Sequence, residues 1–130
     1  MSFHWQLESK IRRVTITADG DFTRADVESY LEVIEASGAV TWSKLFDGRF
    51  GRLAMSREDM LALGVRFRSY HVNGPVGPLA VVVDGMQVDR VDRLLGILAT
   101  ADRPMRVFRE LEPARRWIER LPGIPETSTV

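Results

Sequence analysis

Leu79-Ala80-Val81-Val82-Val83 is the stretch of sequence that decides the fold. It is apolar at every position, and strands of this kind are usually covered on both faces. Asp84-Gly85 leads from it into a helical pattern over about residues 87–101, and a second strand-like run, Pro104 to Phe108, leads into an amphipathic helix from Leu111 to Leu121. This order predicts a parallel sheet with helical crossovers and with Leu79 to Val83 as an interior strand.

Two alternating segments near the amino end predict an antiparallel hairpin. Phe3 to Leu7 and Arg13 to Ala18 each alternate apolar with polar residues, and only a short turn separates them. Asp19-Gly20-Asp21 is expected to end the hairpin, because these residues favour turns. A third strand is expected from about Thr41 to Phe46, ending at Asp47-Gly48, with Arg49 to Met55 as an irregular segment after it.

The first two helices carry start signals. Thr23 precedes the first and Ser56 the second, and each is followed three residues later by an aspartate, which predicts two capping boxes. Ser37-Gly38 is expected to stop the first helix, since glycine tolerates the left-handed cap. His71 to Pro78 contains two glycines and two prolines and is expected to be a loop, with Gly74 to Pro78 as a stiff turn into the next strand.

The composition suits one globular domain. The chain has 130 residues, of which 45 % are hydrophobic and 28 % charged, and its formal net charge is zero, so no overall field favours nucleic acid. The absence of cysteine excludes disulfides, thiolate metal sites and a cysteine nucleophile. We find neither a signal-peptide pattern nor an apolar run long enough for a transmembrane segment, and we expect a cytoplasmic location.

Three segments resemble the SpoIIAA-like family, which is related to STAS domains. They are Lys44-Leu45-Phe46-Asp47, Gly77-Pro78 with the run to Val83, and Arg103 to Arg109 followed by Glu112, Ala114 and Trp117. The resemblance implies an α/β fold, a single SpoIIAA-like (STAS-like) domain of order β-β-α-β-α-β-α-β-α over residues 1–121, with a mixed central sheet flanked by helices. Residues 122–130 are expected to form a flexible tail.

The resemblance also implies where regulation would act. Anti-sigma-factor antagonists of the STAS type are phosphorylated on a serine in an Asp-Ser-Ser/Thr-Gly sequence that starts the helix after the third strand. This chain has Asp47-Gly48-Arg49-Phe50-Gly51 there instead, and its next hydroxyl is Ser56. The missing acceptor motif argues against regulation by the usual kinase. The likeness of SpoIIAA-like proteins to CRAL-TRIO lipid-transfer domains implies a small apolar ligand as an alternative role.

An arginine-flanked helix start is the first candidate site. Ser56 lies where free amides and the helix dipole favour negative charge, and Arg49, Arg52 and Arg57 are close to it in sequence. Together they suit a bound phosphate or carboxylate, or a phosphate placed on Ser56. The alternative is a capping serine in an arginine-rich loop, which the two acidic residues after Arg57 favour because they already occupy the positive end of the dipole.

Acidic residues end two of the predicted strands. Asp47 and Asp84 lie where ligands tend to bind in α/β sheets, and two carboxylates suit acid–base chemistry or a hard cation, but acidic residues before glycine are also common turn formers. A triad of Ser56, His71 and Asp47 is compatible with the spacing, but it lacks a nucleophile-elbow motif. The only histidines, His4 and His71, offer no zinc-ligand spacing. We expect no catalytic residue, no metal and no cofactor.

Aromatic and methionine side chains either form the core or line an apolar pocket. The set comprises Trp5, Trp42, Trp117, Phe46, Phe50, Phe67 and Met60. Phe50 is the best pocket candidate, because it lies in the expected irregular segment, where a large apolar side chain either fills or guards a groove.

The leading hypothesis is a non-enzymatic regulatory or interaction module that binds a protein partner or a second copy of itself. The expected binding surface is the rim from residue 47 to the start of the second helix, and comprises Asp47, Arg49, Phe50, Arg52, Met55, Ser56, Arg57 and Met60. The alternative is a small carrier of an apolar or amphipathic, lipid-like ligand in a cleft at the same helix start, where methionines lie beside arginines that suit an acidic headgroup.

Overall fold

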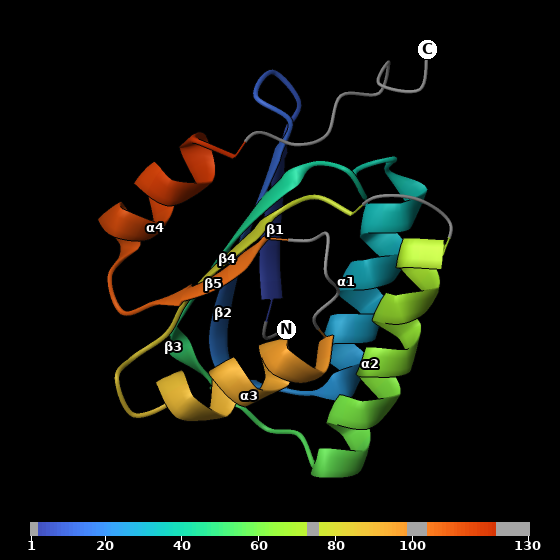
Figure 1. The fold of residues 1–130 in the computed structure, drawn as a ribbon, viewed down its shortest axis with the longest axis vertical. Helices are drawn as coiled ribbons and strands as arrows, with labels where there is room; N and C mark the ends of the chain where they lie inside the picture. Colours follow the sequence, from blue (N-terminus) through green and yellow to red (C-terminus); the bar gives the residue numbers. More distant parts are fainter. Residues whose placement is uncertain (1–2, 73–75, 99–103, 122–130) are drawn as a thin grey trace.

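The computed structural model describes residues 3–72, 76–98 and 104–121, and the expected tail of residues 122–130 lies outside them. Figure 1 shows the arrangement of the elements. In chain order they are β1 (Phe3–Glu8), β2 (Arg13–Phe22), α1 (Arg24–Ala36), β3 (Ser43–Leu53), α2 (Arg57–Val72), β4 (Leu79–Val82), α3 (Val88–Leu98), β5 (Met105–Phe108) and α4 (Leu111–Glu119).

The strands form one mixed sheet in the order β1-β2-β3-β4-β5. β1 and β2 are antiparallel, which confirms the hairpin, and the other neighbours are parallel. The helices α1, α2 and α3 lie on one side of the sheet and α4 lies on the other (Figure 1). The predicted α/β class, element order and flanked mixed sheet are therefore confirmed.

β4 is buried on both faces, as its apolar run predicts. Val81 and the following Val83 belong to the larger core, between the sheet and α1 to α3. Ala80 and Val82 point the other way and pack with Leu45 and with the α4 residues Ala114 and Ile118. Each of the residues from Ala80 to Val83 is at most 5 % exposed, so this strand needs helices on both sides.

The pair β2–β3 is longer than the sequence predicts. We expected turns at Asp19 to Asp21 and at Asp47-Gly48, but both strands continue, and Asp19 to Phe22 pairs with Phe50 to Leu53. A register shift between Thr17 and Asp19 and a positive φ of 75° at Gly20 let β2 continue through its turn-like residues. The added residues of β2 and those of β3 supply backbone hydrogen-bond partners for each other. Pairing between strands that are distant in sequence therefore overrides two local turn signals.

The predicted capping boxes are present. The Asp26 amide donates to Thr23 Oγ1 at 3.4 Å, and the Thr23 amide donates to Asp26 Oδ2 at 2.8 Å. α1 ends with Ser37 as its C-cap, and Gly38 follows with φ of 71°. Both ends of α1 are therefore confirmed.

Three predicted helix boundaries shift, and one of them is the end of α4, at Glu119 instead of Leu121. The loop expected from His71 begins later, because α2 continues through Val72, and residues 73–75 lie outside the described residues. α3 begins one residue after the expected start at Gln87, whose backbone carbonyl accepts a hydrogen bond from the Val91 amide at 2.9 Å. The expected end of α3, beyond Leu98, also lies outside the described residues.

We predict that Gly77→Ala lowers the free energy of unfolding by about 3 kcal/mol, as forced overpacking against a rigid neighbour does. A Cβ at Gly77 would lie 2.0 Å from the Trp42 carbonyl oxygen and 2.6 Å from that of Thr41. These backbone atoms cannot yield in the way that a flexible side chain can, and the Gly77 amide is itself bonded to Val40 O at 2.9 Å. Urea unfolding measures the loss.

The control is Gly85→Ala, since a Cβ there meets nothing within 4 Å. It should change the stability by less than about 0.5 kcal/mol, as ordinary surface substitutions do. Similar losses in the two variants would show that the close approach of Gly77 to the 41–42 backbone does not constrain the fold.

Candidate functional site

Asp47, Arg49 and Phe50 form a compact group on β3. Arg49 Nε and Nη2 donate to Asp47 Oδ1 and Oδ2, each at 2.9 Å, and the Arg49 amide donates to Oδ1 at 3.2 Å. The Arg49 guanidinium carbon lies 5.5 Å from the centre of the Phe50 ring, which is within the range of a cation–π contact. The Phe50 side chain is 69 % exposed, so its ring contacts the arginine on one side, lies mostly in solvent and is not buried in a groove.

The Asp47 carboxylate is held in its charged form. Burial by itself would raise the pKa of Asp47, but the hydrogen bonds from the side chain and backbone of Arg49, together with its charge, outweigh burial and hold the pKa below its ordinary value. A carboxyl group with a lowered pKa is a poor proton donor near neutral pH. The ion pair therefore favours a structural role for Asp47.

Asp84 forms the turn between β4 and α3. Its Oδ1 accepts from the Met86 amide at 2.9 Å and its Oδ2 accepts from Gln87 Nε2 at 3.0 Å. The Gln87 hydrogen bond is the main reason that the pKa of Asp84 is lowered. Gln87 also bonds to β3. Its Nε2 donates to Gly51 O at 2.7 Å, and its Oε1 accepts from the Leu53 amide at 3.0 Å. These contacts favour the turn-forming alternative and show how the turn is fastened to β3.

The extension of β3 separates six of the eight expected site residues into two groups. Asp47 and Leu53 are six positions apart on one strand, and a strand rises by about 3.3 Å per residue, so they lie about 20 Å apart. The first group is Asp47, Arg49 and Phe50. The second is Met55, Arg57 and Met60, at the start of α2. An irregular loop would have allowed one continuous rim, whereas a strand does not.

The second group lines a groove between α2 and α3, which we call the arginine groove. Its residues are Met55, Arg57, Met60, Leu61, Arg90 and Arg93, and its volume is about 530 Å³. Sequence reasoning did not single out Leu61, Arg90 or Arg93 as site residues. The two arginines were missed because α3 lies more than 30 positions along the chain from Met55. The i,i+3 spacing of Arg90 and Arg93 on one helix face was the available signal.

Arg90 is fixed in place by the backbone of the β3–α2 connection. Its Nη1 donates to Leu53 O at 3.0 Å and its Nη2 donates to Met55 O at 3.2 Å. These bonds satisfy carbonyls that follow the end of β3, and they position the guanidinium at the groove before anything binds. A preorganised side chain loses less entropy on binding than a free one.

The remaining two expected residues have other roles. Arg52 is exposed on β3, and its charge contributes to lowering the pKa of Asp84. Ser56 caps α2: its Oγ accepts from the Asp59 amide, and Asp59 Oδ2 accepts from the Ser56 amide, both at 3.1 Å. The capping alternative for Ser56 thus has direct structural support.

The Ser56–His71–Asp47 triad is incompatible with the fold. Ser56 and His71 lie at opposite ends of α2, 15 residues apart, which corresponds to about 22 Å at about 1.5 Å per residue.

Among the described residues no group of three or more His, Asp or Glu side chains could hold a metal ion, and no described helix is long and apolar enough to cross a membrane.

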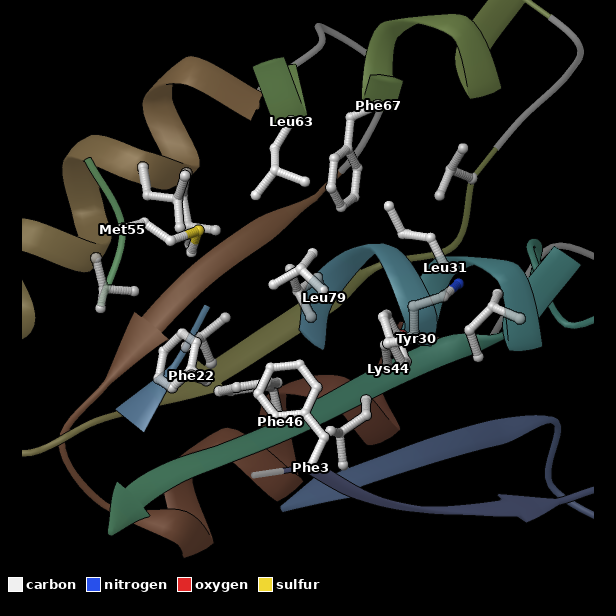
Figure 2. A pocket seen from close by; sticks show the side chains of 18 of the residues that line it. Phe3, Phe22, Tyr30, Leu31, Lys44, Phe46, Met55, Leu63, Phe67 and Leu79 are labelled. Atoms are coloured by element: carbon white, nitrogen blue, oxygen red, sulfur yellow. The ribbon is translucent and has the colours of Figure 1, made fainter. Parts of the chain in front are cut away.

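A separate apolar cavity lies in the larger core, between the sheet and α1 to α3, and it is partly open to the surface. Its volume is about 100 Å³. Figure 2 shows Leu63 and Phe67 of α2 pointing toward Phe46 and Leu79 of the sheet. Of the expected pocket aromatics, Phe46 and Phe67 line this cavity and Phe50 does not. Met55 lines both the cavity and the arginine groove.

We predict that the Asp47–Arg49 pair stabilises the fold in a pH-dependent way. The pKa of Asp47 in the folded protein lies below its ordinary value of 3.8. The contribution of the pair to the free energy of unfolding is therefore complete above pH 3.8 and is lost as the pH falls through the folded pKa. Arg49→Gln should therefore lower the free energy of unfolding by about 0.5 kcal/mol at pH 7, as partly exposed ion pairs do. Urea unfolding from pH 7 to pH 3 should show the difference from wild type shrinking at the acid end. A difference that is constant with pH would contradict the pair's role.

Ser56→Ala should lower the free energy of unfolding by about 1 kcal/mol, the usual cost of a lost N-cap. Ser56→Asn is the matched variant, because an asparagine side chain also accepts from the first-turn amides, and it should retain most of the stability. Chemical denaturation of both variants measures this. Equal losses would mean that the hydroxyl does more than cap the helix.

The fold has solved counterparts. An uncharacterised DUF3478-family protein of SpoIIAA-like fold from Shewanella loihica PV-4 superposes with a TM-score of 0.61 at 17 % identity, over 90 % of this chain and 93 % of that one. The anti-sigma factor antagonist SpoIIAA in its unphosphorylated form superposes with a TM-score of 0.52 at 18 % identity, over 88 % of this chain and 96 % of that one. The Bacillus cell fate determinant SpoIIAA in its phosphorylated form superposes with a TM-score of 0.51 at 19 % identity, over 88 % of this chain and 98 % of that one.

Sequence comparison adds no relative. No protein-family profile matches the chain, and no curated protein sequence matches it. The likeness therefore rests on three-dimensional structure, and it confirms the fold that the sequence segments suggested: this chain has the SpoIIAA-like fold.

Proposed function

We propose that this protein is a regulatory interaction module that binds a protein partner through the arginine groove. The observation that carries the proposal is the composition of the groove. Met55, Met60 and Leu61 provide apolar surface and Arg57, Arg90 and Arg93 provide positive charge, and none of the described residues that line the groove is acidic. The complementary partner is a protein segment with an apolar anchor and acidic side chains, because arginine binds carboxylates bidentately.

The exposed face of α2 extends this surface. Leu61, Val65 and Val72 are 46 %, 63 % and 85 % exposed, and their spacing of four and seven residues places them along one side of the helix. Leu61 and Val65 are one helical turn apart, and exposed apolar patches commonly mark protein interaction sites. Leu61 also lines the groove, so groove and helix face form one surface.

The comparisons support a regulatory role at the level of the fold. SpoIIAA, one of the solved counterparts, is described as an anti-sigma factor antagonist, and it is known in phosphorylated and unphosphorylated forms. In this chain the segment from Asp47 to Gly51 lies within strand β3 and Ser56 is engaged as a helix cap. We therefore propose recognition by charge and apolar contact, without a phosphorylation switch.

We predict that a photo-crosslinking amino acid at position 61 captures the partner in the cells that express this protein. Leu61 is suited to replacement because it is half exposed at the edge of the groove. Adding Arg57→Glu and Arg93→Glu should reduce the yield of the crosslinked product at least about tenfold, which corresponds to about 1.4 kcal/mol of binding free energy. The yield is measured by immunoblot, and mass spectrometry identifies the product.

The matched control is the double charge reversal Arg109→Glu with Arg116→Glu. Both arginines are exposed, and Arg116 lies on α4, on the opposite side of the sheet. This control should leave the yield unchanged. Equal loss in both double variants would contradict a specific role of the groove, and a product of twice the chain mass would identify a second copy of this chain as the occupant in place of a separate partner.

A further inference from the structure

The cavity in the larger core is more than a packing defect. Protein interiors contain few voids larger than a water molecule, whereas this one has a volume of about 100 Å³. A buried water needs two to four polar partners, and the lining side chains are almost all apolar; from the sheet they include Phe46, Val81 and Val83. Apolar cavities of this order stay dry and accept small hydrocarbons such as benzene.

Among the described residues of the lining, the one charged side chain is directed to the backbone. Lys44 is 3 % exposed, and its Nζ donates to the carbonyl oxygens of Val40 and Trp42, each at 2.7 Å. The ammonium charge is thus used to hold the connection between α1 and β3 together. The rest of the lining favours an uncharged occupant, and the volume favours one ring or a short branched chain over a long acyl chain.

Met55 connects this cavity to the arginine groove. It is 5 % exposed and lines both spaces, and its carbonyl oxygen accepts a hydrogen bond from Arg90 at 3.2 Å. Methionine side chains are flexible and adjust to the space available. An occupant of the cavity would therefore shift the floor of the groove and, through the Met55 backbone, the position of Arg90.

We propose that the cavity between the sheet and α1 to α3 binds a small, uncharged apolar ligand, and that Met55 transmits its presence to the arginine groove. Ligand binding is independent of the proposed function, whereas the consequence for a partner rests on it. Ligand and partner then influence each other's affinity by the same factor, because binding linkage is reciprocal.

Methionine-methyl NMR with toluene as the probe tests both parts. In protein labelled with ¹³C at the methionine methyl groups, toluene should shift the signal of Met55 in a saturable way, and that of Met60 to a smaller extent. Met86 is 96 % exposed and serves as the internal control, with an unchanged signal. Met55→Leu and Met60→Leu assign the two resonances.

Filling the cavity should weaken toluene binding. Val81→Ile adds one methylene group into the cavity from β4, and we expect a several-fold loss of affinity with no loss of thermal stability. The matched control is Val82→Ile, one residue along the same strand but on the face toward α4, which should leave toluene affinity unchanged. Val91→Ile, which fills the same cavity from α3, provides a second variant if the first is poorly folded.

Several outcomes would overturn the inference. Absence of a saturable shift of Met55 up to the solubility limit of toluene would exclude the ligand site, and equal weakening by Val81→Ile and Val82→Ile would place the toluene elsewhere. A shift confined to Met55, with no response of Met60 and no change in the crosslinking yield at position 61, would exclude the coupling. Failure of crosslinking alone would count against the arginine groove as a partner site and would leave the toluene result intact.

Discussion

The burial of β4 on both faces is the constraint on which the rest of the structure depends. A strand whose residues from Ala80 to Val83 are all buried cannot lie at the edge of a sheet or face water on one side. It requires strands on both sides, supplied in parallel by β3 and β5, and helices on both faces. Parallel pairing in turn requires the crossovers α2 and α3, so the two helices that form the arginine groove are consequences of this strand.

The long pairing of β2 with β3 determines how the surface is divided. It places Asp47 about 20 Å from Leu53 at the end of β3, given the rise of about 3.3 Å per residue. Arg49 pairs with Asp47 and lies over the Phe50 ring. Beyond it, Gln87 and Arg90 bond to the end of β3 and to the connection that follows. These bonds fasten α3 to β3 and thereby form one wall of the groove.

Met55 belongs to the linings of both the apolar cavity and the arginine groove. It lies in the short connection from β3 to α2. The groove offers charge and apolar surface to a macromolecule, whereas the cavity offers only apolar volume. Under the two proposals above, this shared and flexible wall would make recognition of a partner depend on the contents of the cavity.

The amino-acid sequence alone determined the class of fold, the order of its elements and the caps of α1 and α2. These features follow from local patterns: an unbroken apolar run, alternating strands, and a hydroxyl residue followed by an aspartate three positions later. The sequence also placed Met55, Arg57 and Met60 in the candidate site, since they are neighbours along the chain.

Only the tertiary structure decided the length of β3 and the far wall of the groove. Asp47-Gly48 and Asp19-Gly20 each signal a turn locally, yet both lie within paired strands, Asp47 opposite Thr17 and Asp19-Gly20 opposite Phe50-Gly51. No local sequence pattern encodes that pairing. In the same way, Arg90 and Arg93 line the same groove as Met60 only because the chain passes from α2 through β4 to α3, which places α3 beside α2. Local preference sets each element, but contacts between residues distant in sequence set where the elements end and which side chains meet.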